Sequence, residues 1–209
     1  KIISRKNSSG IDFSDWSVLE NLRDMLDSWE NNCWEAGPNG GINQTVTSPS
    51  NANREIGIVR NSQEKDIQIA LELAEKAYEN WDKQGAVFRA NCLRKAADLL
   101  EKNQVELMAL AILEAGKTIP DAIAEIREAV DFCRYYANLA EEQLANPTIF
   151  KGYTGESNVL TMHGRGVMLC ISPWNFPLAI FMGQVTACLV AGNAVIAKPA
   201  EQTALMAAR

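Results

Sequence analysis

The stretch VMLCISPWNFPLAIFMGQVTACLVAGNAVIAKPA, residues 167–200, decides the fold class. It predicts two apolar strands, 167–172 and 193–200, joined by a helix over 178–192. A crossover through one helix makes the two strands parallel, and unbroken apolar runs are typical of a parallel sheet that is covered on both faces. The sequence therefore predicts an α/β fold that contains a βαβ unit.

Between the first strand and the helix, two prolines enclose Trp174 and Asn175. Proline ends a strand or opens a helix at little cost and fits poorly inside either, so this stretch is predicted to be a stiff corner. Parallel strands end at the same edge of a sheet, so the corner and the end of the second strand, with Lys198 and Glu201, are expected to border one crevice. Open α/β sheets bind their ligands at that edge.

The usual phosphate-binding fingerprint, GxGxxG, is missing after the first strand, and the GRG at 164–166 precedes that strand. A pyrophosphate cradle directly after the strand is therefore disfavoured. Lys198 and Glu201, three residues apart, are instead candidates to hold the two hydroxyls of a ribose, and a carboxylate there would repel a 2′-phosphate. Taken alone, the same two residues would be a solvated ion pair of little energetic value.

The rest of the chain divides by composition. Residues 1–45 are rich in Asn, Ser, Gly and Trp, and they are predicted to be a linker or leader from an upstream region that carries one or two helical turns. A short strand is expected at 56–59, and the glycine-punctuated stretch 146–166 predicts a hairpin or β-flap. Apolar residues at helical spacing predict four consecutive helices, at 64–81, 86–102, 104–115 and 118–146.

Composition excludes several classes of function. The net charge of −6 and pI near 5.0 argue against nucleic acid or an anionic membrane as the main partner. Five scattered cysteines without a CxxC pair indicate reduced thiols and a cytoplasmic location. The chain begins with Lys1 and carries no secretory signal, and we expect it to be an internal piece of a longer protein.

The elements PWNFP (173–177) and KPAEQT (198–203), separated by the βαβ crossover, resemble the aldehyde dehydrogenase superfamily. Together with EAGKTIPDAIAEIREAVDFCRYYA (114–137), they are most similar to its glutamate-semialdehyde (Δ1-pyrroline-5-carboxylate) dehydrogenase branch, as found in bacterial proline utilization A. The resemblance implies that residues 46–209 are the N-terminal part of an NAD-binding domain. Its expected parts are a helical layer, a β-flap (146–166) and the opening βαβ (167–200) of a Rossmann-like parallel sheet.

The activity that this resemblance implies is the NAD-dependent oxidation of L-glutamate γ-semialdehyde to L-glutamate in proline catabolism. NAD is the implied cofactor, and FAD is implied only for an upstream proline dehydrogenase domain, covalently linked but outside this chain. The parent is expected to be a bifunctional homo-oligomer. In the family, the nucleophilic cysteine, the general-base glutamate and a glycine-rich turn follow later than Arg209, so this chain alone is expected to be inactive.

The resemblance also implies roles for individual residues. Asn175 corresponds to the oxyanion-hole amide, which donates to the developing alkoxide. Phe176 is implied to wall the aldehyde pocket, and Glu128 to approach it. The residues implied to contact the cofactor are Ile171, Ser172, Pro173, Trp174, Lys198 and Glu201. No metal site is predicted, the five cysteines are expected to be small buried side chains, and His163 is expected to lie at the surface of the flap.

Two alternatives stay open at this stage. The first is an enzyme of the same superfamily that oxidises another aldehyde, such as succinic semialdehyde. The second belongs to a different class, a non-catalytic nucleotide-binding or scaffold module built on the same fold.

Overall fold

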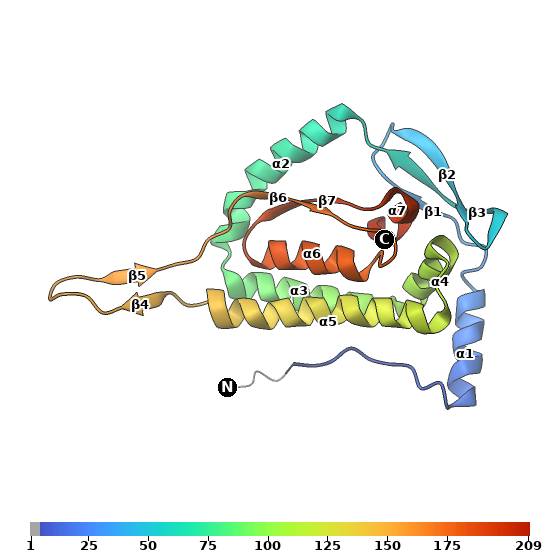
Figure 1. Cartoon of the computed structure of the whole chain (residues 1–209), viewed down its shortest axis with the longest axis horizontal. Coiled ribbons are helices and arrows are strands. Elements are labelled where there is room, and N and C mark those ends of the chain that lie inside the picture. Colours follow the sequence, from blue (N-terminus) through green and yellow to red (C-terminus); the bar gives the residue numbers. More distant parts are fainter. Residues whose placement is uncertain (1–4) are drawn as a thin grey trace.

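The computed structural model describes residues 5–209 and shows helices and strands arranged in layers (Figure 1). The helices are α1 (Trp16–Asp27), α2 (Glu64–Lys83), α3 (Ala86–Lys102), α4 (Gln104–Ala115), α5 (Ile119–Leu144), α6 (Ala179–Val190) and α7 (Ala204–Ala208), with a 3₁₀ turn η1 (Glu201–Thr203). The strands are β1 (Trp34–Ala36), β2 (Ile42–Ser48), β3 (Asn51–Asn61), β4 (Thr148–Phe150), β5 (Asn158–Leu160), β6 (Val167–Ile171) and β7 (Ala194–Lys198).

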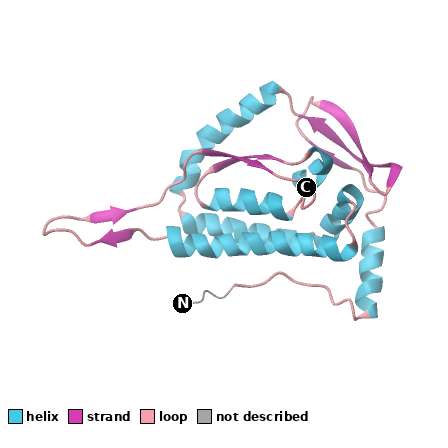
Figure 2. Cartoon of the chain, viewed as in Figure 1, coloured by secondary structure: helices cyan, strands magenta, loops and turns pink. Residues whose placement is uncertain are grey.

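The βαβ unit predicted from residues 167–200 is confirmed. Strands β6 and β7 pair in parallel, from Val167 opposite Ala194 to Ile171 opposite Lys198. Helix α6 connects them and covers one face of this small sheet, while α2 covers the other (Figure 2). A parallel sheet is normally covered on both faces, and the two helices supply part of that cover, while Leu169 and Ile171 of β6 stay exposed. The α/β prediction is therefore confirmed.

The four predicted helices are confirmed as α2 to α5, with ends within a few residues of those expected. Helices α3 and α5 lie side by side in opposite directions beneath α6 (Figure 1). Fully buried small side chains line their contact, and they let the two backbones approach closely; they include Ala90 and Ala97 of α3 and Ala129, Cys133 and Ala137 of α5. Across residues 5–209, no helix has both the length and the apolar character needed to cross a bilayer.

The N-terminal third has more regular structure than its sequence predicts. Helix α1 has twelve residues, about three turns rather than one or two. Strands β1 and β2 flank β3 in a sheet of order β1-β3-β2, with β1 parallel and β2 antiparallel to β3. β2 is mostly polar and exposed, so it carries no apolar signal, and its pairing with β3 is what makes it a strand. Trp34 of β1 is buried and donates to Glu106 Oε1 of α4 (3.2 Å).

Within residues 146–166, β4 and β5 pair as an antiparallel hairpin that projects away from the rest of the molecule (Figure 1). The hairpin carries exposed apolar side chains, among them Ile149 (78% exposed), Phe150, Val159 and Leu160. Exposed apolar side chains gathered in this way are typical of surfaces that contact another protein.

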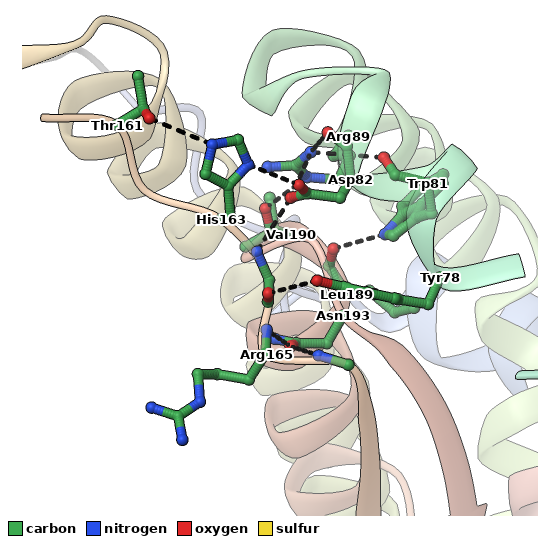
Figure 3. Close-up of polar contacts among 12 residues, drawn as sticks. Tyr78, Trp81, Asp82, Arg89, Thr161, His163, Arg165, Leu189, Val190 and Asn193 are labelled. Carbon is green, nitrogen blue, oxygen red and sulfur yellow. Dashed lines mark hydrogen bonds and ion pairs between the residues drawn. The ribbon is translucent and has the colours of Figure 1, made fainter. Parts of the chain in front are cut away.

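The base of the hairpin is tied to the end of α2 by polar contacts (Figure 3). Asp82 accepts from the backbone N–H of Gly164 (3.0 Å) and lies 2.8 Å from His163 Nδ1. Tyr78 Oη donates to the Gly164 carbonyl (2.7 Å). Burial acts to raise the pKa of Asp82, but the hydrogen bond from Gly164 and the contact with His163 together outweigh it, so the pKa is lowered. His163 is exposed, as expected, and belongs to this junction.

Arg89 of α3 joins the same region to the βαβ unit (Figure 3). Its buried guanidinium donates to the carbonyls of Asp82 (2.7 Å) and Val190 (2.8 Å), at the C-terminal ends of α2 and α6. A cation is favourable at these two places because the last carbonyls of a helix lack partners and carry partial negative charge. Helices α2 and α6, on opposite faces of the sheet, are thereby held at one point.

Candidate functional site

The corner after β6 begins with two fixed contacts of Ser172. Its backbone N–H donates to the Lys198 carbonyl (3.0 Å), which continues the β6–β7 ladder by one residue. Its buried hydroxyl donates to Gln184 Oε1 of α6 (3.1 Å). These bonds place Pro173 and the residues after it beside the end of β7, so the two sequence elements predicted to share one edge do so.

The tip of the corner is open to solvent. Trp174 is 55% exposed, Phe176 is 40% exposed, and Asn175 is exposed between them. Lys117, at the start of the segment that leads into α5, donates from Nζ to the Asn175 carbonyl (2.7 Å). The same ammonium lies 4.4 Å from the centre of the Phe176 ring, within the range of a cation–π contact. The tip of the corner is therefore accessible to a ligand, and Lys117 holds its backbone in place.

The N-terminus of α6 is closed by a buried carboxylate. Glu125 of α5 is 1% exposed, and its Oε2 accepts from the backbone N–H groups of Leu178 (3.2 Å) and Ala179 (3.1 Å). Its Oε1 lies 3.3 Å from Lys117 Nζ. The first N–H groups of a helix lack acceptors within the helix and carry partial positive charge. Glu125 supplies both an acceptor and a negative charge at this helix end.

Helix α7, which follows β7, is closed in the same way by Glu114 of α4. The two carboxylate oxygens accept from the backbone N–H groups of Leu205 and Met206, each at 2.8 Å. Burial raises the pKa of Glu114 to about 7, although these two hydrogen bonds act in the opposite direction. Because protein carboxylates already fill the N-termini of α6 and α7, neither can cradle the pyrophosphate of a nucleotide.

A pocket of about 450 Å³ lies at the end of β7. Lys198 and Glu201 line it from one side, and Gly37, just after β1, and Arg60 of β3 line it from the other. Within the described part of the chain, Lys198 and Glu201 form no ion pair with each other, and Glu201 Oε1 accepts from Gln202 Nε2 (3.3 Å). Both side chains are exposed and can turn toward a bound group.

The other predicted site residues are placed as follows. Ile171, the last residue of β6, is opposite Lys198 in the ladder and is exposed. Glu128 is exposed on α5, three residues after Glu125 and therefore on a neighbouring part of the helix surface. The structure thus places the corner residues together with Lys198 and Glu201 at one edge of the sheet. Glu128 lies apart from them, in the helical layer, on α5.

The sequence predicted no role for three charged residues of this region: Lys117, Glu114 and Glu125. A signal existed for the two glutamates, since each falls within a stripe of buried apolar side chains on its helix. A carboxylate in such a stripe is rarely buried without partners. Lys117 lies between two helices, and no pattern in the sequence marks it.

Burial raises the pKa of two thiols of this region, Cys170 and Cys133. Sγ of Cys170 lies 3.8 Å from Sγ of Cys188, and burial together with this neighbour raises the pKa of Cys170 to about 11. Burial raises the pKa of Cys133 to about 12. A thiol whose pKa is raised is a poor nucleophile, so neither Cys170 nor Cys133 is a candidate for catalysis. Between residues 5 and 209, no cluster of three or more His, Cys, Asp or Glu side chains could hold a metal ion.

A βαβ unit whose first strand leads into PWNFP and whose second leads into KPAEQT defines a class of protein. The sequence profile described as "Aldehyde dehydrogenase family" matches residues 36–209, and the chain belongs to this family. Members of the family generally use NAD or NADP.

Similar proteins narrow the comparison. The bifunctional protein PutA of Escherichia coli (strain K12) is 39% identical over 98% of this chain and 15% of its own length. The 1-pyrroline-5-carboxylate dehydrogenase of Staphylococcus epidermidis is 34% identical over 99% of this chain and 41% of its own length. A crystal structure of proline utilization A from Bdellovibrio bacteriovorus, 32% identical, has a TM-score of 0.91 over 99% of this chain and 22% of its own. The chain therefore spans less than half of the length of these relatives.

Proposed function

We propose that this chain is part of an NAD-dependent dehydrogenase that oxidises L-glutamate γ-semialdehyde to L-glutamate in proline catabolism. The observation that carries the proposal is the exposed Asn175 at the tip of the proline corner after β6, while the neighbouring strand β7 ends at the pocket lined by Lys198 and Glu201. The names of the similar proteins, PutA and 1-pyrroline-5-carboxylate dehydrogenase, support this aldehyde over others.

Asn175 is proposed to act as an oxyanion-hole donor. When a nucleophile adds to an aldehyde, negative charge develops on the carbonyl oxygen, and a fixed amide N–H lowers the energy of that state. The backbone of Asn175 is fixed by Lys117, while its side chain is exposed and available to a substrate. Phe176, next to it, is proposed to wall the aldehyde pocket, and Glu128 to approach the pocket from α5.

The pocket at the end of β7 is proposed to hold the adenosine part of NAD. Lys198 and Glu201 offer a cation and a carboxylate to the two ribose hydroxyls, and a carboxylate disfavours the 2′-phosphate of NADP. Ile171, Ser172, Pro173 and Trp174 are proposed to flank the cofactor from the neighbouring strand. When bound, NAD accepts the hydride that the aldehyde loses. The closed N-termini of α6 and α7 require that its pyrophosphate is held by other groups.

The decisive experiment measures NADH formation by the full-length protein with L-glutamate γ-semialdehyde and with succinic semialdehyde. We expect the first to give the higher kcat/KM. Asn175→Ala should lower kcat about 10²–10³-fold, the usual cost of losing one oxyanion donor. Asn91→Ala, on the exposed surface of α3, is the matched control and should leave kcat unchanged. Equal kcat in the Asn175→Ala variant would contradict the assigned role.

Cofactor binding has a separate test. Glu201→Gln removes the charge that is proposed to hold the ribose, so the KM for NAD should rise with little change in kcat. The alternative substrate would be supported by a higher kcat/KM for succinic semialdehyde. NAD binding without oxidation of either aldehyde would support the non-catalytic module.

The proposal extends to the organisation of the parent protein. Residues 1–45 are proposed to join this domain to an upstream, FAD-containing proline dehydrogenase domain, which the name of bifunctional PutA supports. The exposed apolar residues of the β4–β5 hairpin are proposed to pair subunits in a homo-oligomer. Ile149→Lys should then shift the sedimentation of the full-length protein toward the monomer. Five free thiols support a cytoplasmic location.

A further inference from the structure

We propose that Lys117 and Glu125 are positioning residues, which hold the Asn175 corner in the geometry that the aldehyde reaction needs. The inference rests on the proposed function, because it concerns the same corner. Neither residue is expected to touch the substrate, and their effect passes through the backbone of residues 175–179.

One ammonium group makes every contact that this role requires. Lys117 Nζ donates to the Asn175 carbonyl (2.7 Å), lies 3.3 Å from Glu125 Oε1 and faces the Phe176 ring at 4.4 Å. Its side chain is only 16% exposed, so these contacts are formed largely away from solvent. Two neighbouring residues of the tip are thereby held by a single cation.

Glu125 holds the other side of the corner. Its Oε2 accepts from the N–H groups of Leu178 and Ala179, just after the second proline, and fixes where α6 begins. Its Oε1 makes no hydrogen bond of normal geometry in the described structure, and Lys117 is the cation that offsets its charge. A buried carboxylate is costly without such a partner, so the two residues depend on each other.

The origin of Lys117 in the chain makes it a rigid support. Gly116, with φ +66°, ends α4 in the left-handed conformation, and the backbone N–H of Lys117 donates to the Ala111 carbonyl (3.2 Å). One residue later, the Thr118 side chain accepts from Asp121 N and caps α5. Lys117 therefore lies between two capped helix ends and has little backbone freedom of its own.

The test uses four variants of the full-length protein: Lys117→Met, Lys117→Arg, Asn175→Ala and the double variant Lys117→Met/Asn175→Ala. A displacement of about 1 Å at a reacting group costs on the order of 10²-fold in rate, so Lys117→Met should lower kcat by that factor. The KM for NAD should change less than about twofold, because the pocket of Lys198 and Glu201 is on a different loop and the start of the corner at Ser172 is held by Lys198 and Gln184, not by Lys117. Lys117→Arg keeps the charge and should restore part of kcat.

The double variant separates positioning from general structural damage. If Lys117 acts through Asn175, removing it from a protein that already lacks the Asn175 amide should cost little more in kcat. Losses that multiply in the double variant would overturn the inference. Lys95→Met, on the exposed surface of α3, is the matched control and should behave as wild type.

A second measurement decides the inference even if the wild-type protein oxidises no aldehyde, a result that would refute the proposed function alone. Hydrogen exchange of the Leu178 and Ala179 amides can be followed by NMR in the 209-residue chain. Lys117→Met should speed their exchange at least tenfold relative to amides of α3. Unchanged protection of both amides would show that Lys117 does not hold the corner.

Discussion

The buried carboxyl group of Glu114 makes the stability of this fold depend on pH in a direction that can be worked out. Its pKa is raised by burial from the ordinary 4.5 to about 7. The folded state therefore binds a proton more readily than the unfolded state. Its contribution to stability is fully present below about pH 4.5 and is lost as the pH rises through about 7.

The magnitude follows from the same two pKa values. Between pH 5 and pH 8, this difference in proton binding lowers the free energy of unfolding by about 2–3 kcal/mol, at about 1.4 kcal/mol for each pKa unit. In the Glu114→Gln variant the glutamine has nearly the same shape as glutamate and does not titrate, so its unfolding free energy should not fall in this way between pH 5 and pH 8. It should also pay a pH-independent cost of about 1–3 kcal/mol, because its NH₂ group cannot accept from one of the two N–H groups.

The assay is urea unfolding of the 209-residue chain, followed by tryptophan fluorescence at several pH values between 5 and 8. Relative to wild type, Glu114→Gln should gain about 2–3 kcal/mol from the lowest to the highest pH. Glu75→Gln, at an exposed position of α2, should run parallel to wild type. If the plot of unfolding free energy against pH for Glu114→Gln also runs parallel to that of wild type, that result refutes the reasoning. It would mean that Glu114 has the same pKa in the folded and unfolded states.

Two further perturbations test the fold. A Cβ added to Gly164 would lie 2.3 Å from the Gly192 carbonyl oxygen, so Gly164→Ala should destabilise the chain by about 1–3 kcal/mol in urea unfolding, while Gly10→Ala, which meets only the end of a flexible arginine, should cost far less. Thr118→Ala removes the cap of α5 and should cost about 1 kcal/mol in thermal melting, whereas Thr118→Ser should keep most of that stability; equal melting of both variants would contradict the capping role.

Local patterns were sufficient for most of the secondary structure. Helices α2 to α5 show apolar residues at helical spacing, and both strands of the βαβ unit are continuous apolar runs. These signals are local, because a helix or strand that buries one face must place apolar residues on that face every few positions. Strand β2 lacks such a face, and only its hydrogen bonds to β3 define it.

The features of the candidate site can likewise be separated into those set by local sequence and those set by packing. The sequence by itself determined the βαβ unit, the proline corner with Asn175 at its tip, and the presence of Lys198 and Glu201 at the neighbouring strand end, since short-range chain geometry places them. Only the tertiary structure decided that Glu125 closes α6 and that Lys117 reaches the corner, 58 residues further along the chain. Such partners depend on how separate helices pack, and no periodicity within one segment records that packing.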